Sequence, residues 1–230
     1  MSTQALILAA GRGERMRPLT DATPKPLLQV QGKPLIVWHL EKLAAAGVTE
    51  VVINTAWLEQ QFPAALGDGR AFGLRIRYSH EGAQFGGALE TAGGIATALP
   101  LLKDAPFWLL AGDVFMPEFG FPASDAHRFA ASSALAHIYL VPNPLHNPQG
   151  DFGISPDGLA LSRAAQQFTY GTVGIYHPAL FRDTPAGQKA ALAPLLRRAM
   201  QDGQVTAALY SGPWTDVGTP ERLAELNSTQ

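Results

Sequence analysis

A glycine-rich segment near the N-terminus carries a high density of cationic side chains. Residues 11–17 read Gly-Arg-Gly-Glu-Arg-Met-Arg, and Lys25 follows between two prolines. The glycines allow backbone N–H groups to approach an anion closely, as a phosphate-binding loop requires. Arg12, Arg15, Arg17 and Lys25 supply up to four positive charges, which suits a triphosphate. The flanking prolines stiffen the backbone at Lys25 and so aim its side chain.

The same segment has a simpler interpretation, as a strand-to-helix turn with solvated basic residues. Gly-Arg-Gly alone leaves that interpretation open. Its combination with Pro-Leu-Thr at residues 18–20 and Pro-Lys-Pro at residues 24–26 favours phosphate binding. The segment is not a Walker loop, because no Gly-Lys-Ser/Thr closes it, and its spacing differs from the dinucleotide fingerprint. A dinucleotide-dependent oxidoreductase is therefore disfavoured.

Two aspartates follow apolar runs that lie far apart in the sequence. Asp113 ends an Ala-Gly-Asp segment, and Asp216 lies within Trp-Thr-Asp-Val-Gly. Mg²⁺ prefers oxygen ligands and usually takes one or two carboxylates beside phosphates and water. Each aspartate also has a structural interpretation, a turn for Asp113 and a helix cap for Asp216. Thr219 is the better cap, since Pro220 then takes the first helical position. If both aspartates bind one metal, their segments must converge in space.

Strand-like and helix-like segments alternate in the first half of the chain. Apolar or alternating runs predict strands at residues 5–9, 51–53, 74–78 and 107–110. Helical patterns begin at residues 34, 57 and 90, and Gly47 is suited to the C-terminal cap of the first. Short apolar strands separated by helices predict a mostly parallel sheet that is covered on both faces. Ligands of such sheets bind at the carboxyl ends of the strands.

The second half predicts antiparallel additions to this sheet. Strands are expected at 135–141, 168–176 and 205–210, a hairpin around the turn at 156–158, and an amphipathic helix at 190–200. We therefore expect an α/β fold, Rossmann-like and three-layered, with a mostly parallel sheet. Since no repeat or linker divides the chain, residues 1–230 are predicted to form one domain. Its nucleotide-binding half covers about 1–120 and its sugar-binding half about 121–230.

A second glycine pair, Gly93-Gly94, lies in the helix that begins at residue 90. Glycines near a helix N-terminus allow backbone groups to reach a flat base, although a plain helix start is the simpler interpretation. Glu81 follows the strand that precedes this helix. His39 falls within an amphipathic helix and is interpreted as structural. The spacing of the remaining histidines is not that of metal ligands.

These motifs resemble those of the sugar-1-phosphate nucleotidyltransferase family. Gly11-x-Gly13-x-Arg15, Pro24-Lys25-Pro26-Leu27 and Gly32-Lys33-Pro34 look like its signature, and the later motifs arrive in the family's order over nearly the whole chain. Within the family, the compact length is most similar to uridylyltransferases of N-acetylmuramate 1-phosphate, which lack a C-terminal β-helix. The segment 83–89 departs from the family, where this connection is usually shorter and bears Pro-Leu, and it puts base selectivity in question.

The resemblance implies a fold of the nucleotide-diphospho-sugar transferase type and a role for each matching position. Arg15 and Lys25 would act on the triphosphate, and Asp113 and Asp216 would hold Mg²⁺. The nucleotide would be bound by Leu8, Ala9, Ala10, Gly11, Gly13, Glu81, Gly93 and Gly94. The acceptor sugar would meet Asn143, Asp151 and Gly171, although each of these also suits a turn or a strand edge.

Composition limits the classes of protein to consider. The 230 residues are long enough for one sizeable core, and the net charge of −2 gives no excess of cations for binding nucleic acid. The absence of cysteine excludes disulfides and thiolate chemistry. No apolar run reaches the length of a membrane span and no signal peptide is apparent, so a cytoplasmic location is expected. A monomer or small homo-oligomer is consistent with the sequence.

The predicted activity is transfer of a nucleotidyl group from a nucleoside triphosphate to a sugar 1-phosphate. UTP and N-acetylmuramate 1-phosphate are the favoured substrates, in cell-wall sugar (peptidoglycan) recycling. One alternative is thymidylyl or guanylyl transfer to glucose or mannose 1-phosphate. A further alternative is a non-catalytic protein that senses nucleotide sugars. Such a protein would be expected to lose Lys25 or one of the two aspartates, and all three are present.

Overall fold

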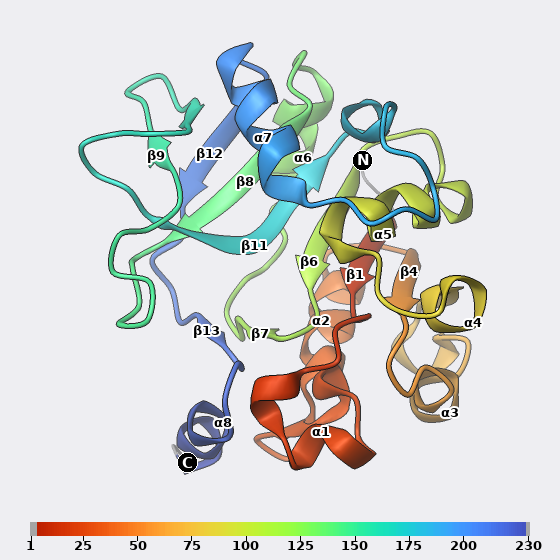
Figure 1. Cartoon of the computed structure of the whole chain (residues 1–230). Helices are drawn as coiled ribbons and strands as arrows, with labels where there is room; N and C mark the ends of the chain where they lie inside the picture. Colours follow the sequence, from red (N-terminus) through yellow and green to blue (C-terminus); the bar gives the residue numbers. More distant parts are fainter. Residues whose placement is uncertain (1–3, 229–230) are drawn as a thin grey trace.

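A computed structural model describes residues 4–228. Seven strands form a central sheet in the order β12-β8-β11-β6-β1-β4-β5 (Figure 1). Six strands run in one direction, whereas β11 is antiparallel to both of its neighbours. The predicted mostly parallel sheet with antiparallel additions is therefore confirmed. The bounds are β1 (Gln4–Leu8), β4 (Glu50–Thr55), β5 (Arg75–His80), β6 (Phe107–Ala111), β8 (Ala136–Val141), β11 (Thr169–Tyr176) and β12 (Val205–Leu209).

Three short strand pairs lie outside the central sheet. The pairs are β2 (Gln29–Val30) with β3 (Lys33–Pro34), β7 (Val114–Phe115) with β13 (Thr215–Asp216), and β9 (Gly153–Ile154) with β10 (Ala160–Leu161). The β9–β10 pair is the hairpin that the sequence predicts. The β7–β13 pair joins the end of the nucleotide half to the C-terminal segment, and it matters most for the site.

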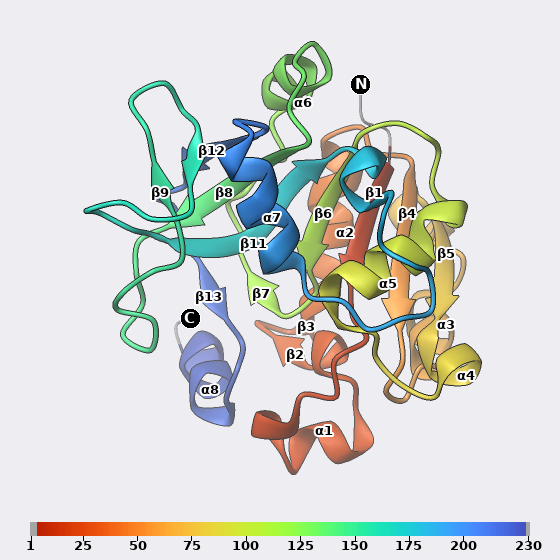
Figure 2. The same cartoon turned by 45° about the horizontal axis from the view of Figure 1, so that its top comes forward.

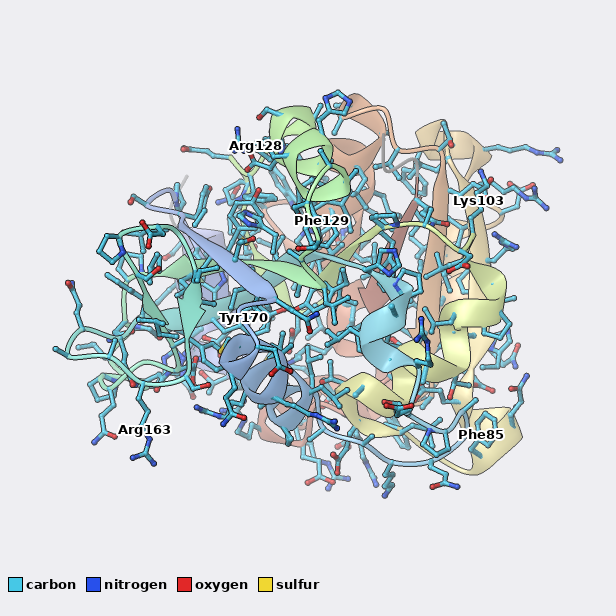
Figure 3. All side chains as sticks on the ribbon, turned by 90° about the horizontal axis from the view of Figure 1, so that it is seen from above. Phe85, Lys103, Arg128, Phe129, Arg163 and Tyr170 are labelled. Carbon is cyan, nitrogen blue, oxygen red and sulfur yellow. The ribbon has the colours of Figure 1, made fainter. Side chains whose placement is uncertain are left out.

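Helices cover both faces of the sheet, which gives the predicted three layers (Figure 2). One face carries α2 (Leu35–Ala45), α3 (Gln61–Leu66) and α6 (Ala123–Ala130). The other face carries α5 (Glu90–Ala98) and α7 (Leu192–Gln201). Viewed from above, α6 with Phe129 lies on the opposite side of the sheet from α7 (Figure 3). The remaining α-helices within residues 4–228 are α1 (Leu19–Ala22), α4 (Glu81–Phe85) and α8 (Pro220–Ser228).

The alternation of side chains along β1 explains why it lies at the centre. Ala5 and Ile7 pack in the core under α2, and Leu6 packs in the core under α5. A strand with two buried faces reads as a continuous apolar run, as this one does. None of the helices within 4–228 is long and apolar enough to cross a membrane.

Two local expectations differ from the structure. The helix expected at 57–66 begins only at Gln61, because Leu58 takes a positive φ of 48° that a helix does not allow. Pro34 lies at the N-cap position of α2 and not in its first turn. At the other end of α2, Gly47 has a φ of 82° and donates its N–H to the Ala44 carbonyl, which confirms the predicted cap.

Candidate active site

The carboxyl ends of β1, β4 and β6 surround a cavity of about 250 Å³. Six of the predicted site residues line it: Leu8, Ala9, Ala10, Gly11, Lys25 and Asp113. The other lining residues are Pro26, Asn54, Ala88, Glu90, Thr91 and Ala111. The sequence predicts a ligand at this edge of the sheet, because the carboxyl ends of the parallel strands meet there. We call this cavity the nucleotide-side pocket.

Asn54 at the end of β4 fixes the backbone of the glycine-rich loop. The Ala9 N–H donates both to the backbone carbonyl of Asn54, at 3.1 Å, and to its side-chain oxygen, at 2.8 Å. On the other side of β1, the Gly112 N–H donates to the Leu8 carbonyl at 2.8 Å. The loop that leaves β1 is therefore held from both neighbouring strands, which preorganises the pocket wall.

A second cavity, of about 310 Å³, adjoins the first through Lys25. Gly13, Glu14, Arg15 and Gly218 complete its lining. Gly13 has a φ of 68°, and its carbonyl accepts a hydrogen bond from the Thr20 hydroxyl at 2.8 Å. The loop is thus closed into a turn that aims Arg15 and Lys25 at a shared space. This cavity is the candidate triphosphate end of the site.

The four cations of the segment do not share one environment. Arg15 and Lys25 line the triphosphate end. Arg12 stacks over the Trp57 ring, with its guanidinium carbon 4.4 Å from the ring centroid. Arg17 forms an exposed ion pair with Asp21. The geometry therefore favours Arg15 and Lys25 as the triphosphate-binding pair, as the sequence predicts.

The two predicted metal ligands meet through the β7–β13 pair. Asp216 lies opposite Val114 in that pair, and the Val217 N–H donates to the Asp113 carbonyl at 2.8 Å. The required convergence of the two segments is therefore present. Two segments that are distant in the chain become neighbours because β13 pairs with β7, the short strand that follows β6 (Figure 1).

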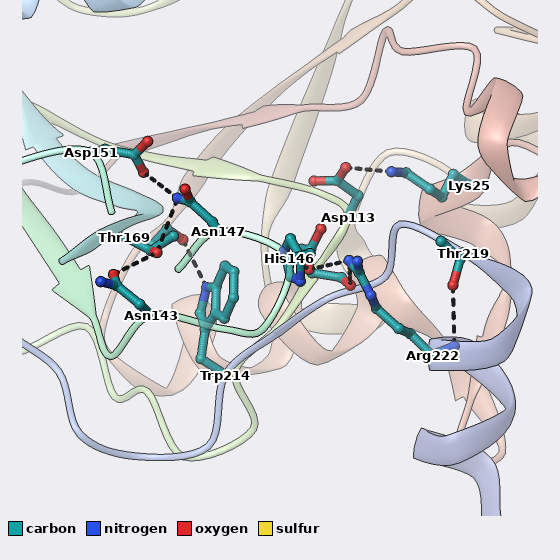
Figure 4. A network of polar contacts seen from close by, with 12 residues as sticks. Lys25, Asp113, Asn143, His146, Asn147, Asp151, Thr169, Trp214, Thr219 and Arg222 are labelled. Atoms are coloured by element: carbon teal, nitrogen blue, oxygen red, sulfur yellow. Dashed lines mark hydrogen bonds and ion pairs between the residues drawn. The ribbon is translucent and has the colours of Figure 1, made fainter. Parts of the chain in front are cut away.

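Both aspartates form ion pairs with cationic side chains. Lys25 Nζ lies 2.5 Å from Asp113 Oδ2. Asp216 Oδ1 accepts from the Arg222 guanidinium at 2.5 Å and lies 3.1 Å from His146 Nε2 (Figure 4). Pairing of this kind offsets the repulsion between two neighbouring carboxylates.

The donor set suits Mg²⁺ better than a metal held by the protein alone. No group of three or more His, Cys, Asp or Glu side chains within the described part of the chain is arranged to hold an ion. Two aspartates leave most of the coordination shell to phosphates and water, which is the usual arrangement for Mg²⁺ beside a triphosphate. The oxygen donors present therefore fit the predicted cofactor.

Three residues predicted to bind the nucleotide lie beneath the pocket. Glu81 is fully buried. Added Cβ atoms at Gly93 and Gly94 would collide with the Gln188 carbonyl and with the Asn54–Glu81 pair, at 2.1 and 2.6 Å. Both glycines are therefore explained by close packing. Direct contact of these three with a base is not seen in the lining, and it stays a prediction.

A third and larger cavity, of about 470 Å³, lies beside the nucleotide-side pocket. The two share Leu8, Glu90, Thr91 and Ala111. The rest of its lining is mainly apolar, from β11, α7 and the segment before β9: Phe152, Tyr170, Thr172, Ala191, Leu192, Ala193 and Leu196. Because the two cavities share these residues, a ligand in the larger cavity would lie next to a nucleotide in the nucleotide-side pocket. We call this cavity the acceptor pocket.

Two strained residues lie on the wall of the acceptor pocket. Glu90 and Thr172 have φ values of 59° and 56°, in the left-handed region that residues other than glycine rarely adopt. The register between β11 and β8 shifts between Tyr170 and Gly174, so Thr172 lies at a bulge. Strain of this kind concentrates at ligand sites, where the surrounding structure maintains it.

Two of the predicted sugar-binding residues, Asn143 and Asp151, hold a loop at 142–150, and the third, Gly171, contacts Trp214 (Figure 4). Asn143 donates to the Gln167 carbonyl at 2.9 Å. Asp151 accepts from Asn147 at 3.2 Å and from the Tyr170 N–H at 2.8 Å. The Gly171 carbonyl accepts from the Trp214 indole at 3.1 Å. None of the three lines the acceptor pocket in this structure, so direct contact with a sugar stays a prediction.

Sequence reasoning missed several residues of the site. Asn54 ends a parallel strand, and the rule used for Asp113 applies equally to it. No local sequence pattern indicates a role for Glu90 or Thr172, because their positive φ values are known only from the structure. His146 approaches Asp216 from a loop that is distant in the chain, whereas Arg222 reaches back to it from the start of α8.

Comparison with known proteins identifies the family. A family model described as nucleotidyl transferase matches residues 4–169. N-acetylmuramate alpha-1-phosphate uridylyltransferase of Neisseria meningitidis is 52% identical over 98% of this chain and 97% of its own, and that of Caulobacter vibrioides is 36% identical over 96% and 97%. A crystal structure of a putative glucose-1-phosphate thymidylyltransferase from Bacillus anthracis has the same fold, with a TM-score of 0.83 and 22% identity over 98% and 94% of the chains. The chain therefore belongs to the sugar-1-phosphate nucleotidyltransferases.

Proposed function

We propose that the protein transfers a uridylyl group from UTP to N-acetylmuramate 1-phosphate in a Mg²⁺-dependent reaction. The observation that carries this proposal is the adjacency of three cavities around Lys25, Asp113 and Glu90. One suits a base and ribose, one a triphosphate and one an acceptor. Identity of 52% over nearly full length to an N-acetylmuramate alpha-1-phosphate uridylyltransferase supports the choice of substrates. The three cavities adjoin one another through shared lining residues, so the chain acts as a single nucleotidyltransferase domain.

The reaction is a direct in-line displacement. A phosphate oxygen of the sugar 1-phosphate attacks the α-phosphorus of UTP, and the bond to the departing pyrophosphate breaks. A phosphate monoester is already a nucleophile near neutral pH, so no general base is required. Lys25 and Arg15 hold the triphosphate and neutralise charge as the bond breaks. Asp113 and Asp216 would hold Mg²⁺, which supplies additional positive charge at the phosphates.

The apolar lining of the acceptor pocket is consistent with an N-acetylated, lactyl-bearing sugar. Phe152, Leu192 and Leu196 offer carbon surface to the methyl groups of such substituents. A hexose 1-phosphate without substituents would leave this surface in contact with water, at a cost that grows with the exposed apolar area. We place the reaction in the cytoplasm, where nucleoside triphosphates are available, as a step in cell-wall sugar recycling.

Pyrophosphate release tests the proposal. Each of UTP, dTTP, GTP and CTP is combined with N-acetylmuramate, N-acetylglucosamine, glucose and mannose 1-phosphates, with Mg²⁺ or with excess chelator. We expect the highest kcat/KM for UTP with N-acetylmuramate 1-phosphate, and no turnover with the chelator. A higher kcat/KM for dTTP or GTP with glucose or mannose 1-phosphate would replace the substrate assignment. Binding without pyrophosphate release under any combination would refute the catalytic function.

A further inference from the structure

Asn54, in the wall of the nucleotide-side pocket, and Glu81 behind it form a buried polar pair. The two residues are 2% and 0% exposed, respectively. Asn54 Nδ2 donates to Glu81 Oε1 at 2.6 Å. Burial raises the pKa of Glu81, while its hydrogen bonds with Leu89 and Asn54 favour the ionised form. A carboxylate in such a place is costly unless its oxygens are hydrogen-bonded.

The pair connects two segments of the pocket wall. On one side, Asn54 Oδ1 accepts from the Ala9 N–H at 2.8 Å. On the other side, Glu81 Oε2 accepts from the Leu89 N–H at 2.9 Å. Ala9 lines the pocket, and Leu89 lies between the lining residues Ala88 and Glu90. The chain of hydrogen bonds thus runs from the loop after β1 to the start of α5.

The backbone of α5 at Gly94 packs directly against the same pair. A Cβ atom there would lie 2.6 Å from both Asn54 Nδ2 and Glu81 Oε1. Real Cβ atoms do not approach polar atoms so closely, so only glycine accommodates the pair at this point of α5. A third segment of the chain therefore depends on the Asn54–Glu81 contact.

The direction of each hydrogen bond determines which side chains are acceptable. Both groups that face Glu81, the Asn54 amide nitrogen and the Leu89 N–H, are donors. A carboxylate accepts on both oxygens, whereas a glutamine accepts on one side and presents a donor on the other. The Ala9 N–H in turn fixes the orientation of the Asn54 amide, because it requires the oxygen.

We infer that Glu81 is a positioning residue that acts through Asn54 and Leu89 to hold the two walls of the nucleotide-side pocket at a fixed separation, without itself touching the nucleotide. The inference rests on the proposed use of this pocket for a nucleoside triphosphate. It replaces direct recognition of the base by Glu81 with an indirect role, through Ala9 and through the Ala88–Glu90 segment.

An exchange of chemical groups between the two positions tests this role. Glu81→Gln places a donor against a donor and should weaken UTP binding about tenfold, seen as a raised Kd by calorimetry and a raised KM, with kcat changed less. In the double variant Asn54→Asp with Glu81→Gln, the introduced carboxylate accepts from both the Ala9 N–H and the introduced amide, whose oxygen still accepts from Leu89. We expect UTP affinity to return to within about threefold of the wild type, at unchanged net charge.

Glu59→Gln is the matched control. Glu59 is also a buried carboxylate of this region, but only its Oε1 accepts a backbone N–H, from Ala83 at 3.1 Å. Its Oε2 has no hydrogen-bond partner within residues 4–228. The amide nitrogen of a glutamine can therefore take this position without opposing a backbone N–H, with His80 Nδ1 3.7 Å away. We expect UTP affinity within about twofold of the wild type for this variant.

The outcomes separate the alternatives. A double variant that binds UTP no better than Glu81→Gln overturns the inference, and so does a single variant with unchanged affinity. A change in preference between UTP and CTP that persists in the double variant would indicate direct base contact instead. If Glu81→Gln does not fold, recovery of both folding and binding in the double variant supports the inference, and its absence refutes it. Failure of the wild type to bind any triphosphate would instead refute the proposed function.

Discussion

The nucleotide-side pocket and the acceptor pocket are built in different ways. The first is formed largely by backbone at the ends of parallel strands, with hydrogen bonds from Asn54 and Gly112 to the loop after β1. The second is lined by side chains of α7, of the β11 bulge and of the segment at Phe152. The difference indicates a frame held by backbone hydrogen bonds on the nucleotide side and a wall of exchangeable side chains on the acceptor side.

The two pockets also differ in charge. Lys25 and Asp113 place an ion pair on the nucleotide side, and Asp216 is held by Arg222 nearby. The acceptor side is lined mostly by carbon, apart from Glu90 and a few hydroxyl groups. Loss of one charge should therefore reduce the rate of the reaction, whereas loss of space on the acceptor side should reduce the affinity for one substrate.

The largest effect is expected for Asp113→Asn on the nucleotide side. Loss of the charge weakens the metal site and leaves Lys25 without its partner, so kcat should fall about 10³-fold. Pyrophosphate release measures this fall, and a circular-dichroism spectrum and melting temperature like those of the wild type show that the fold is kept. Asp183→Asn, an exposed acid, is the matched control and should retain full activity. Turnover within about tenfold of the wild type for Asp113→Asn would exclude Asp113 as a metal ligand.

Acid should destabilise the nucleotide side through His39. Burial lowers the pKa of His39 from 6.5 to about 4, and its Nε2–H donates to the Val114 carbonyl, beside Asp113. Because the folded state disfavours the protonated ring, this stability is complete above pH 6.5 and is lost as pH falls toward 4. The expected loss in the free energy of unfolding is about 3 kcal/mol at pH 4.

Urea unfolding at pH 7 and pH 4 measures the contribution of His39. In His39→Gln the amide keeps the hydrogen bond to Val114 and does not titrate in this range. The difference in stability between wild type and variant should therefore shrink on acidification. A difference that is the same at both pH values would show that His39 is protonated equally in the folded and unfolded states.

A smaller and more selective effect is expected on the acceptor side. Ala193 is exposed in the first turn of α7 and lines the acceptor pocket. Ala193→Phe should fill part of that space and raise KM for the sugar 1-phosphate about tenfold, with KM for UTP unchanged. Initial rates with each substrate varied in turn give both constants. Arg198→Phe, at an exposed position of the same helix, is the control. Equal increases in both constants would mean that the pockets are not separate.

The residues of the phosphate loop and the order of elements could be predicted from the sequence. The conformation of a phosphate loop depends on local backbone preferences, which glycine and proline set. Residues 8–17 and Lys25 could therefore be recognised as a candidate phosphate loop from the sequence. Buried strands and amphipathic helices follow from their periodicity, and the sheet edge that binds ligands follows from their order. Asp113 was found for the same reason.

Only the tertiary structure decided which distant residues meet. Pairing of β13 with β7 brings Asp216 to Asp113, and long-range packing buries Glu81 against Asn54. The sequence assigned Glu81, Gly93 and Gly94 to the nucleotide, since a polar residue and a glycine pair near a helix start are typical of both binding and packing. Their burial shows the packing role, which depends on the whole fold, while contact with the nucleotide stays a prediction. Local chemistry therefore specified the phosphate loop, while the carboxylate pair and the pocket walls required contacts that no local pattern encodes.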